Sequence, residues 1–198
     1  MDKRIKDKFK NFNYYLICIM FIADFTFKIC IFGDSGVGKT TLTRRFITGK
    51  FETDIKTTLG AEIFVKHLEI KNIKISIQIW DFGGEENFRF LLPTYSKGSS
   101  GGIFMFDITN QGSLNSIIEW LDTFKQGLAP TERKLPILLI GGKLDLDNNR
   151  VVRVEDATDK LKKLNLFDYF ECSSVTGENI EKIFQTLIIA ILKKNCIL

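Results

Sequence analysis

The chain has 198 residues, of which 44% are hydrophobic and 26% are charged, and its formal net charge is +4. This length and composition fit one domain with a substantial core, and they exclude a disordered chain or a membrane protein with many spans. Five basic and two acidic residues lie within residues 1–10, so the remainder is close to neutral and we expect no nucleic-acid groove.

Strand-like and helix-like stretches alternate from Phe25 onward. Two strand-like runs are separated only by Lys71 and Asn72, which predicts a tight antiparallel hairpin. The alternation predicts a doubly wound α/β sheet that binds ligands outside the carboxyl ends of its strands. In chain order, we expect strands at 25–32, 61–70, 73–80, 102–106, 137–140 and 169–172, and helices at 39–47, 114–124, 154–164 and 180–192.

The sequence also predicts where two helices begin and what state the cysteines are in. Ser113 is the expected start of the helix at 114–124, and Glu178 or Asn179 that of the last helix. The cysteines form no C-x-x-C pair and no metal-ligand spacing with the sole histidine, His67, so we expect reduced thiols, a cytoplasmic setting and a structural role for His67. The cysteines are Cys18, Cys30, Cys172 and Cys196.

Residues 33–40, Gly-Asp-Ser-Gly-Val-Gly-Lys-Thr, fit the P-loop pattern G-x-x-x-x-G-K-[ST] between a predicted strand and a predicted helix. Glycines let backbone N–H groups surround a phosphate, while Lys39 can reach the β- and γ-phosphates and Thr40 can ligate Mg²⁺. An ordinary strand–turn–helix connection is the alternative, which the context disfavours. The candidate phosphate-binding residues are Asp34, Ser35, Gly36, Val37, Gly38, Lys39, Thr40 and Thr41.

A second candidate segment, Trp80-Asp81-Phe82-Gly83-Gly84-Glu85-Glu86, follows the hairpin. Asp81, at the end of a strand, suits a carboxylate on the Mg²⁺ side, and Gly84 can offer its backbone N–H to a γ-phosphate. Thr58, in the polar stretch 53–60, is the candidate that closes over the metal; a plain loop threonine is the alternative. The candidate metal site is therefore Thr40, Thr58 and Asp81.

The candidate base site begins at Gly141-Gly142-Lys143-Leu144-Asp145, after the predicted strand at 137–140. Guanine presents N1–H beside an exocyclic amine, so the Asp145 carboxylate can accept both hydrogen bonds, whereas adenine would leave it unpaired. Lys143 can lay its aliphatic stem along the base, although a solvated loop is the alternative for this segment alone. Backbone N–H groups of Ser173, Ser174 and Val175 can meet the guanine carbonyl oxygen.

These motifs identify a family. The chain from about residue 25 to 192 resembles Ras-superfamily small GTPases, and most of all the Rab type, through GDSGVGKT (33–40), KTTLG (56–60), WDFGGEE (80–86), GGKLD (141–145) and ECSSVTGEN (171–179). The resemblance implies the small G domain of P-loop NTPases, in which a six-stranded sheet with one antiparallel strand is flanked by about five helices. It implies GTP or GDP and Mg²⁺ as ligands, and slow hydrolysis of GTP as a switch in membrane trafficking or signalling.

The resemblance also assigns roles. Thr40 and Thr58 would ligate Mg²⁺ with Asp81 behind a water, Phe51 would pack edge-on against the base, and Lys143, Asp145 and Ser174 would face guanine. Lys39, Gly84 and Glu85 are the candidate catalytic residues. An effector, an exchange factor and a GTPase-activating protein are the implied partners.

Three departures from the family pattern matter. Glu85 stands where a glutamine usually orients the attacking water, and no arginine lies between Arg45 and Arg89 to act in cis. Gly142 replaces an asparagine that contacts the base and the P-loop, so weaker guanine binding is expected. Val175 replaces a lysine, with little expected effect because backbone amides act there. The alternative to a GTP-hydrolysing switch is therefore a hydrolysis-poor GTP-binding scaffold; an ATP-using enzyme is disfavoured by Asp145.

The ends of the chain lie outside the expected domain, 25–194. Residues 1–24 are basic and then apolar, with an unbroken apolar run at 14–23, which is about half the length needed to span a bilayer. An interfacial membrane anchor within residues 1–23, an extension packed on the domain, and a true start at Met20 remain open, and Met20 is favoured. In the tail, 195–198, Cys196 is third from the end, so no C-a-a-X prenylation is expected.

Overall fold

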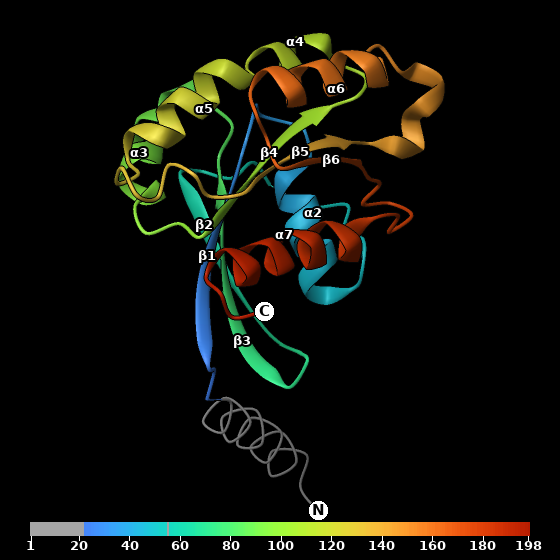
Figure 1. Ribbon diagram of the computed structural model, residues 1–198. Helices are drawn as coiled ribbons and strands as arrows, with labels where there is room; N and C mark the ends of the chain where they lie inside the picture. The colour runs from blue at the N-terminus through green and yellow to red at the C-terminus, as the bar shows by residue number, and fades with distance from the viewer. Residues whose placement is uncertain (1–21, 55) are drawn as a thin grey trace, which may run out of the picture.

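The computed structural model describes residues 22–54 and 56–198, and it contains a six-stranded sheet with helices on both faces (Figure 1). Five strands are parallel, and the edge strand β2 pairs antiparallel with β3, in the order β2-β3-β1-β4-β5-β6. The predicted doubly wound architecture with one antiparallel strand is confirmed. The strands are β1 (Phe25–Phe32), β2 (Ala61–Ile70), β3 (Ile73–Phe82), β4 (Gly101–Asp107), β5 (Ile137–Gly142) and β6 (Asp168–Glu171).

The described residues form six α-helices and two 3₁₀-helices. The α-helices are α2 (Lys39–Thr48), α3 (Leu92–Ser96), α4 (Gln111–Asn115), α5 (Ile117–Gln126), α6 (Val154–Lys163) and α7 (Ile180–Lys194). The 3₁₀-helices are η1 (Glu86–Leu91) and η2 (Leu144–Asn149).

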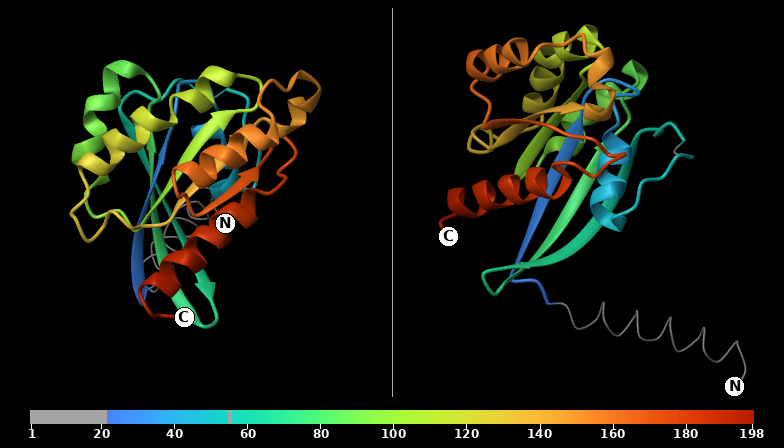
Figure 2. Two further views of the ribbon diagram at one scale, coloured as in Figure 1. Left: turned by 45° about the horizontal axis from the view of Figure 1, so that its top comes forward. Right: turned by 90° about the vertical axis from the view of Figure 1, so that its right-hand side faces the viewer.

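Two aromatic-rich cores lie on opposite faces of the sheet. On one face α2 and α7 pack together, with the rings of Phe46 and Phe184 stacked at 3.8 Å between centroids. On the other face α3, α4, α5 and α6 cover the sheet, where Phe32 stacks on Phe124 at 4.6 Å. Figure 2 shows the two helix layers from the side. Because both faces are covered, β4 and β5 are buried along their whole length, as central parallel strands generally are.

The hairpin of β2 and β3 closes through the two residues that the sequence indicated. Lys71 and Asn72 have φ angles of 51° and 65°, and Ile70 pairs with Ile73 across the turn. Positive φ at both central residues is the geometry whose twist matches the two strands. The predicted tight hairpin is therefore present, and its tip lies at the end of the sheet opposite the P-loop (Figure 1).

The helix predicted at 114–124 is wrong in its start and its continuity. It begins earlier, because the Asn110 side chain accepts a hydrogen bond from Gly112 N at 2.9 Å and so caps α4. Ser113 is buried inside that helix instead of starting it. The chain then bends at Ser116, and α5 begins at Ile117. The last helix does follow Asn179, as expected.

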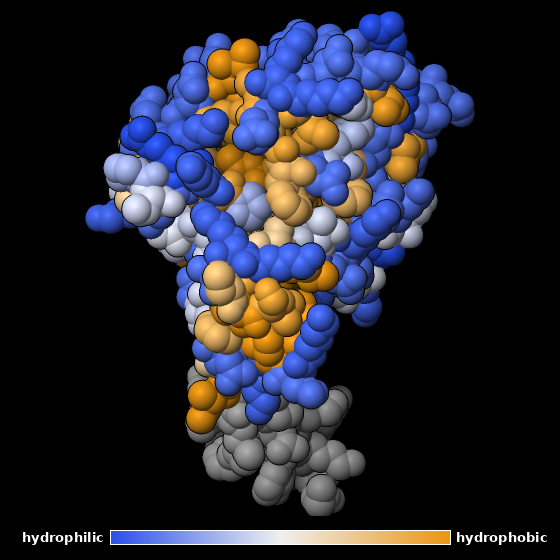
Figure 3. Space-filling model, viewed as in Figure 1, coloured by the Kyte–Doolittle hydropathy of each residue, from blue (hydrophilic) through white to orange (hydrophobic). Residues whose placement is uncertain are grey.

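The surface near the hairpin carries apolar side chains. Figure 3 shows a hydrophobic patch where Figure 1 has the hairpin strands and the C-terminal end of α7. Leu68, Ile70, Ile73 and Ile197 are partly buried and pack against the core beneath α7. Within the described residues, no helix has the length and apolarity needed to cross a membrane. The readings offered for residues 1–21 fall outside the described part of the chain.

Candidate functional site

The P-loop connects the end of β1 to the start of α2 and requires glycine at fixed points. Gly33 and Gly38 have φ angles of 139° and 104°, which side chains with a Cβ rarely adopt. A Cβ on Gly33 would also lie 2.1 Å from the carbonyl oxygen of Met105 on β4. The loop therefore follows the sheet closely before turning into the helix, as the motif requires.

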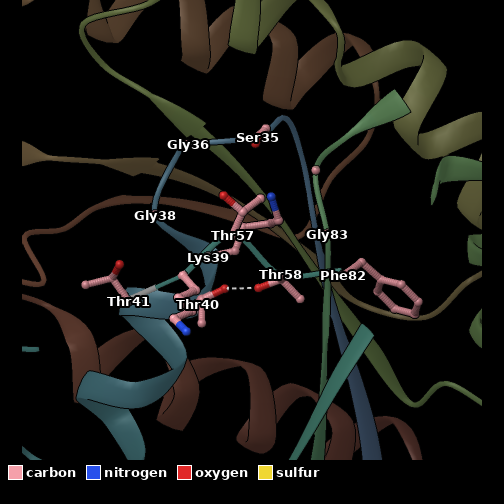
Figure 4. Close-up of a pocket in the computed structure, with 12 residues that line it drawn as sticks. Ser35, Gly36, Gly38, Lys39, Thr40, Thr41, Thr57, Thr58, Phe82 and Gly83 are labelled. Carbon is pink, nitrogen blue, oxygen red and sulfur yellow. Dashed lines mark hydrogen bonds between the residues drawn. The ribbon is translucent and has the colours of Figure 1, made fainter. Parts of the chain in front are cut away.

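A polar cavity of about 200 Å³ opens between this loop and two segments, one just before the hairpin and one at its end (Figure 4). It is lined by eight of the predicted nucleotide-site residues and by four more that lie within the quoted motifs but were not predicted as site residues. The predicted residues are Ser35, Gly36, Gly38, Lys39, Thr40, Thr41, Thr58 and Gly84, and the additional ones are Lys56, Thr57, Phe82 and Gly83.

Lys39 lies at the floor of the cavity and is only 5% exposed. Its Nζ donates to the carbonyl oxygens of Gly33 at 2.8 Å and Asp34 at 2.7 Å. Burial lowers the pKa of Lys39 to about 8, against the opposing effect of the Asp81 and Asp34 carboxylates. The P-loop thus holds one ammonium group against its own carbonyl oxygens, where it lines the cavity and can reach an anion bound there.

Thr40, Thr58 and Asp81 converge beside Lys39. Thr40 Oγ1 lies 2.8 Å from Thr58 Oγ1 and donates to Asp81 Oδ2 at 2.5 Å. Asp81 is fully buried, and its second oxygen, Oδ1, has no hydrogen-bond partner among residues 22–54 and 56–198. Burial raises the pKa of Asp81 to about 6, although the hydrogen bond from Thr40 and the charge of Lys39 act the other way.

This donor set fits a magnesium ion. A buried carboxylate oxygen without a partner is costly, and a cation beside it would remove that cost. One carboxylate with hydroxyl oxygens suits Mg²⁺, which typically keeps several waters and binds substrate phosphates as well. Thr58 and Asp81 lie 18 and 41 positions after Thr40 in the sequence, and the fold brings the three residues together.

Gly83 and Gly84 form another part of the phosphate cavity's lining. Gly83 N donates to Gly60 O at 2.8 Å, which joins the second candidate segment to the first. A Cβ on Gly84 would lie 2.2 Å from backbone atoms of Asp34 and Ser35, so only glycine fits between them. The predicted approach of the Gly84 backbone to the phosphate cavity is thus sterically possible only without a side chain.

The Asp34 side chain points away from the cavity, although the residue was predicted among the phosphate-binding set. Its Oδ1 accepts from Trp120 Nε1 at 2.7 Å and its Oδ2 from Ser116 Oγ at 3.0 Å, both on or beside α5. Arg89 lies 4.0 Å from the same carboxylate and over the Trp120 ring. Asp34 therefore does not line the cavity: its carbonyl oxygen accepts from Lys39, and its carboxylate anchors the P-loop to α5.

A second cavity, of about 270 Å³, lies on the same edge of the sheet and shares Gly38 and Thr41 with the first. It brings together the predicted base-site residues from four separate loops. Its lining is Val37, Gly38, Thr41, Phe51, Met105, Lys143, Asp145, Leu146, Ser174 and Val175. Phe51 is 40% exposed at the mouth.

Two contacts orient the polar groups of this second cavity. Ser173 is buried outside the lining, and its Oγ donates to Asp145 Oδ1 at 2.5 Å. Lys143 has a φ of 66°, and its Nζ lies 2.6 Å from Oδ2 of Asp107, at the end of β4. Sequence reasoning missed Asp107. Its position at the carboxyl end of a predicted strand was the available signal.

Glu85 is the predicted catalytic residue that the structure does not bring to the phosphate cavity. It lies between Gly84 and η1 and is absent from the residues that line the cavity. No arginine lies between it and Arg45, and the cation that the first segment brings to the cavity is Lys56. A role for Glu85 stays a prediction.

A P-loop at the edge of a doubly wound sheet, with a polar cavity beside it and a second cavity that shares Gly38 and Thr41, defines a P-loop nucleotide-binding domain. The Ras family model matches residues 28–193. The chain is 35% identical over 170 residues to Ras-related protein RABA4d of Arabidopsis thaliana, covering 86% of this chain and 75% of that protein.

Two further relatives agree. The chain is 37% identical over 172 residues to Ras-related protein Rab-1 of Theileria parva, covering 86% of this chain and 76% of the relative. It is 34% identical over 170 residues to GTP-binding protein ypt3 of Schizosaccharomyces pombe, covering 86% and 78%. The chain belongs to the Ras family of small GTPases and is Rab-like.

Proposed function

We propose that the protein binds GTP and GDP together with Mg²⁺ and hydrolyses GTP to GDP and phosphate as a molecular switch. The observation that carries this is the pair of cavities that share Gly38 and Thr41, because one nucleotide can then place its phosphates in the first and its base in the second. The relative named as a GTP-binding protein supports the same ligand.

Guanine selection rests on Asp145, which Ser173 orients. Its carboxylate accepts from the N1–H and the exocyclic amine of guanine, and adenine offers no such pair of donors. Asp145→Asn should therefore lose GDP and gain xanthosine diphosphate, since xanthine has a carbonyl where guanine has the amine. Comparable affinities of the unmodified protein for GTP and ATP would refute guanine selection.

Hydrolysis requires charge neutralisation and positioning. Lys39 and the loop amides would bind the β- and γ-phosphates, and Gly84 N–H would meet the γ-phosphate. Mg²⁺ held by Thr40, Thr58 and Asp81 would neutralise charge on the phosphate oxygens. We expect chelation of Mg²⁺ by EDTA to accelerate release of a fluorescent GDP analogue by at least about tenfold.

Switching would follow from loss of the γ-phosphate. Thr58 and Gly84 would release their contacts, and residues about 53–60 and 84–95 would become disordered. These segments would present the binding surface for an effector, an exchange factor and a GTPase-activating protein. Amide hydrogen exchange on the GDP form and on the form with a non-hydrolysable GTP analogue tests this, and equal protection in both forms would refute it.

A hydrolysis-poor scaffold is the second candidate, and Glu85 favours it. Glu85 follows Gly84 in the chain and does not line the cavity as described, and its negative charge would oppose a nearby γ-phosphate. Single-turnover phosphate release by the unmodified protein and by Glu85→Gln separates the two. Release no faster than that of free GTP would leave only the binding role, and a gain on Glu85→Gln would assign the defect to the carboxylate.

We infer a GTPase domain over 25–194 and a cytoplasmic protein that can attach peripherally to membranes through residues 1–23. Peptide mapping of the native protein tests the start at Met20, which peptides from residues 3–15 would exclude. Flotation with anionic vesicles tests the attachment.

A further inference from the structure

Met105 occupies the space beside Gly142. It lies on β4, is 1% exposed, and its terminal methyl carbon, Cε, approaches the Gly142 backbone. A Cβ on Gly142 would lie 2.4 Å from that Cε and 3.0 Å from the carbonyl oxygen of Val37. A side chain at position 142 could therefore enter only if Met105 moved away and the P-loop yielded.

The same methyl group connects the two parts of the nucleotide site. It lies 3.4 Å from the position that a Cβ on Gly38 would take, and Met105 lines the second cavity together with Val37 and Gly38. In the sheet, Met105 pairs with Ile140 at the strand that leads into Gly142. An unbranched thioether fills such an irregular space well. The contact that Met105 makes between the base-site segment 141–145 and the P-loop is thus apolar.

The chemical groups on each edge of guanine determine which edge would face Met105 and Gly142. With N1–H and the amine on Asp145, and the carbonyl oxygen toward residues 173–175, the imidazole edge is left for the P-loop side of the cavity. That edge carries one more acceptor, N7. The thioether of Met105 is at most a weak acceptor, and Gly142 has no side chain that could donate to N7.

We propose that Met105 and Gly142 form an apolar wall that holds the imidazole edge of guanine by contact, so that the site accepts guanine nucleotides with or without an acceptor at position 7. This rests on the proposed function and refines it. The site should therefore discriminate little between GDP and an analogue that lacks N7, because a site that makes no hydrogen bond to a group loses no affinity when that group is absent.

The test compares GDP with 7-deaza-GDP, in which a C–H group replaces N7, by competition against a fluorescent GDP analogue in excess Mg²⁺. The unmodified protein should bind both within about threefold. The double variant Met105→Ala with Gly142→Asn makes room for an amide donor, and it should prefer GDP by about three- to tenfold, the value of one hydrogen bond. Gly142→Asn alone should bind GDP more weakly than the double variant, because Met105 obstructs the new side chain.

Ile103→Val is the matched control for loosening of the core. Ile103 lies two residues earlier on β4, is fully buried in the same core and does not line the cavity. It should leave the ratio of GDP to 7-deaza-GDP affinity unchanged. A change in that ratio as large as in the double variant would overturn the assignment to Met105.

Failure of the inference and failure of the proposed function give different results. If the folded protein binds neither GDP nor 7-deaza-GDP, the proposed function falls. If it binds GDP but discriminates against 7-deaza-GDP by more than about threefold, a donor faces N7 and only the inference falls. If Gly142→Asn binds GDP as well as the double variant does, Met105 does not fill the space, and the inference falls likewise.

Discussion

The Trp120–Asp34 hydrogen bond should be a measurable part of the stability of the domain. Trp120 is fully buried, and its Nε1 donates to Asp34 Oδ1 at 2.7 Å. Trp120→Phe keeps an aromatic ring in the core but removes the donor. A hydrogen bond to a charged group contributes about 1.5–3 kcal/mol, and the lost ring contacts add about 1 kcal/mol. The expected loss is therefore about 2.5–4 kcal/mol, or about 5–15 °C in Tm for a chain of this size.

A second tryptophan provides the control for ring loss alone. The indole Nε1 of Trp80 is buried and has no hydrogen-bond partner within the described structure. Trp80→Phe removes the same atoms without breaking such a bond, so it should lower Tm less than Trp120→Phe does. Both variants are measured by thermal unfolding with the same GDP and Mg²⁺ concentrations, because ligand binding shifts Tm. Equal Tm values for the two variants would refute the reasoning.

The same anchor should affect nucleotide retention. Asp34 keeps its bond from Ser116 in Trp120→Phe, but the carboxylate loses its more buried partner. We expect the P-loop to become more mobile and a fluorescent GDP analogue to dissociate faster than from the Trp80→Phe control. The dissociation rate is measured after adding excess unlabelled GDP.

Three further predictions test other contacts. Gly84→Ala places a methyl group 2.2 Å from the Asp34 backbone, so single-turnover phosphate release should slow by about tenfold to a hundredfold while the far-UV circular dichroism stays unchanged. Asp107→Asn replaces the partner of Lys143 at 2.6 Å, and competition binding should show GDP affinity reduced by about tenfold. Burial would raise the pKa of Asp107, but hydrogen bonds from Lys143 and Thr109 hold it below its usual range. Its stabilisation is therefore complete above about pH 4 and is lost as the pH falls through the lowered pKa, so urea titrations should show the unmodified protein losing more stability in acid than Asp107→Asn.

The local parts of the fold could be predicted because their signals lie in short stretches. The β1 strand and the P-loop follow from an apolar run and a spacing pattern within residues 25–40, and the hairpin from two turn residues between two strands. The structure extends β5 to Gly142 and adds a 3₁₀-helix over Leu144–Asn149. Backbone hydrogen bonds decide those ends, and hydropathy does not report them.

The missed contacts of the site depend on partners far apart in the sequence. Asp107 meets Lys143 because β4 and β5 are parallel in a register that places Asp107 opposite Gly142. Asp34 and Trp120 are separated by 86 positions, and only packing of α5 on the sheet brings them together. A motif names the residue types that a ligand needs. It does not reveal which side chains hold the motif in place.

The ladder between β2 and β3 has a consequence for how the cavity opens. It is continuous from Ile70 opposite Ile73 to Ala61 opposite Phe82, and the bond from Gly83 N to Gly60 O extends it to the phosphate cavity. At the cavity end, this ribbon joins residues that are 21 and 23 positions apart, Ala61 with Phe82 and Gly60 with Gly83. Opening of the ribbon should begin at the end that no turn closes, where Gly60 meets Gly83. The Gly83 amide should therefore be the first of the ribbon to exchange its proton with solvent, and its exchange rate reports how often the cavity opens.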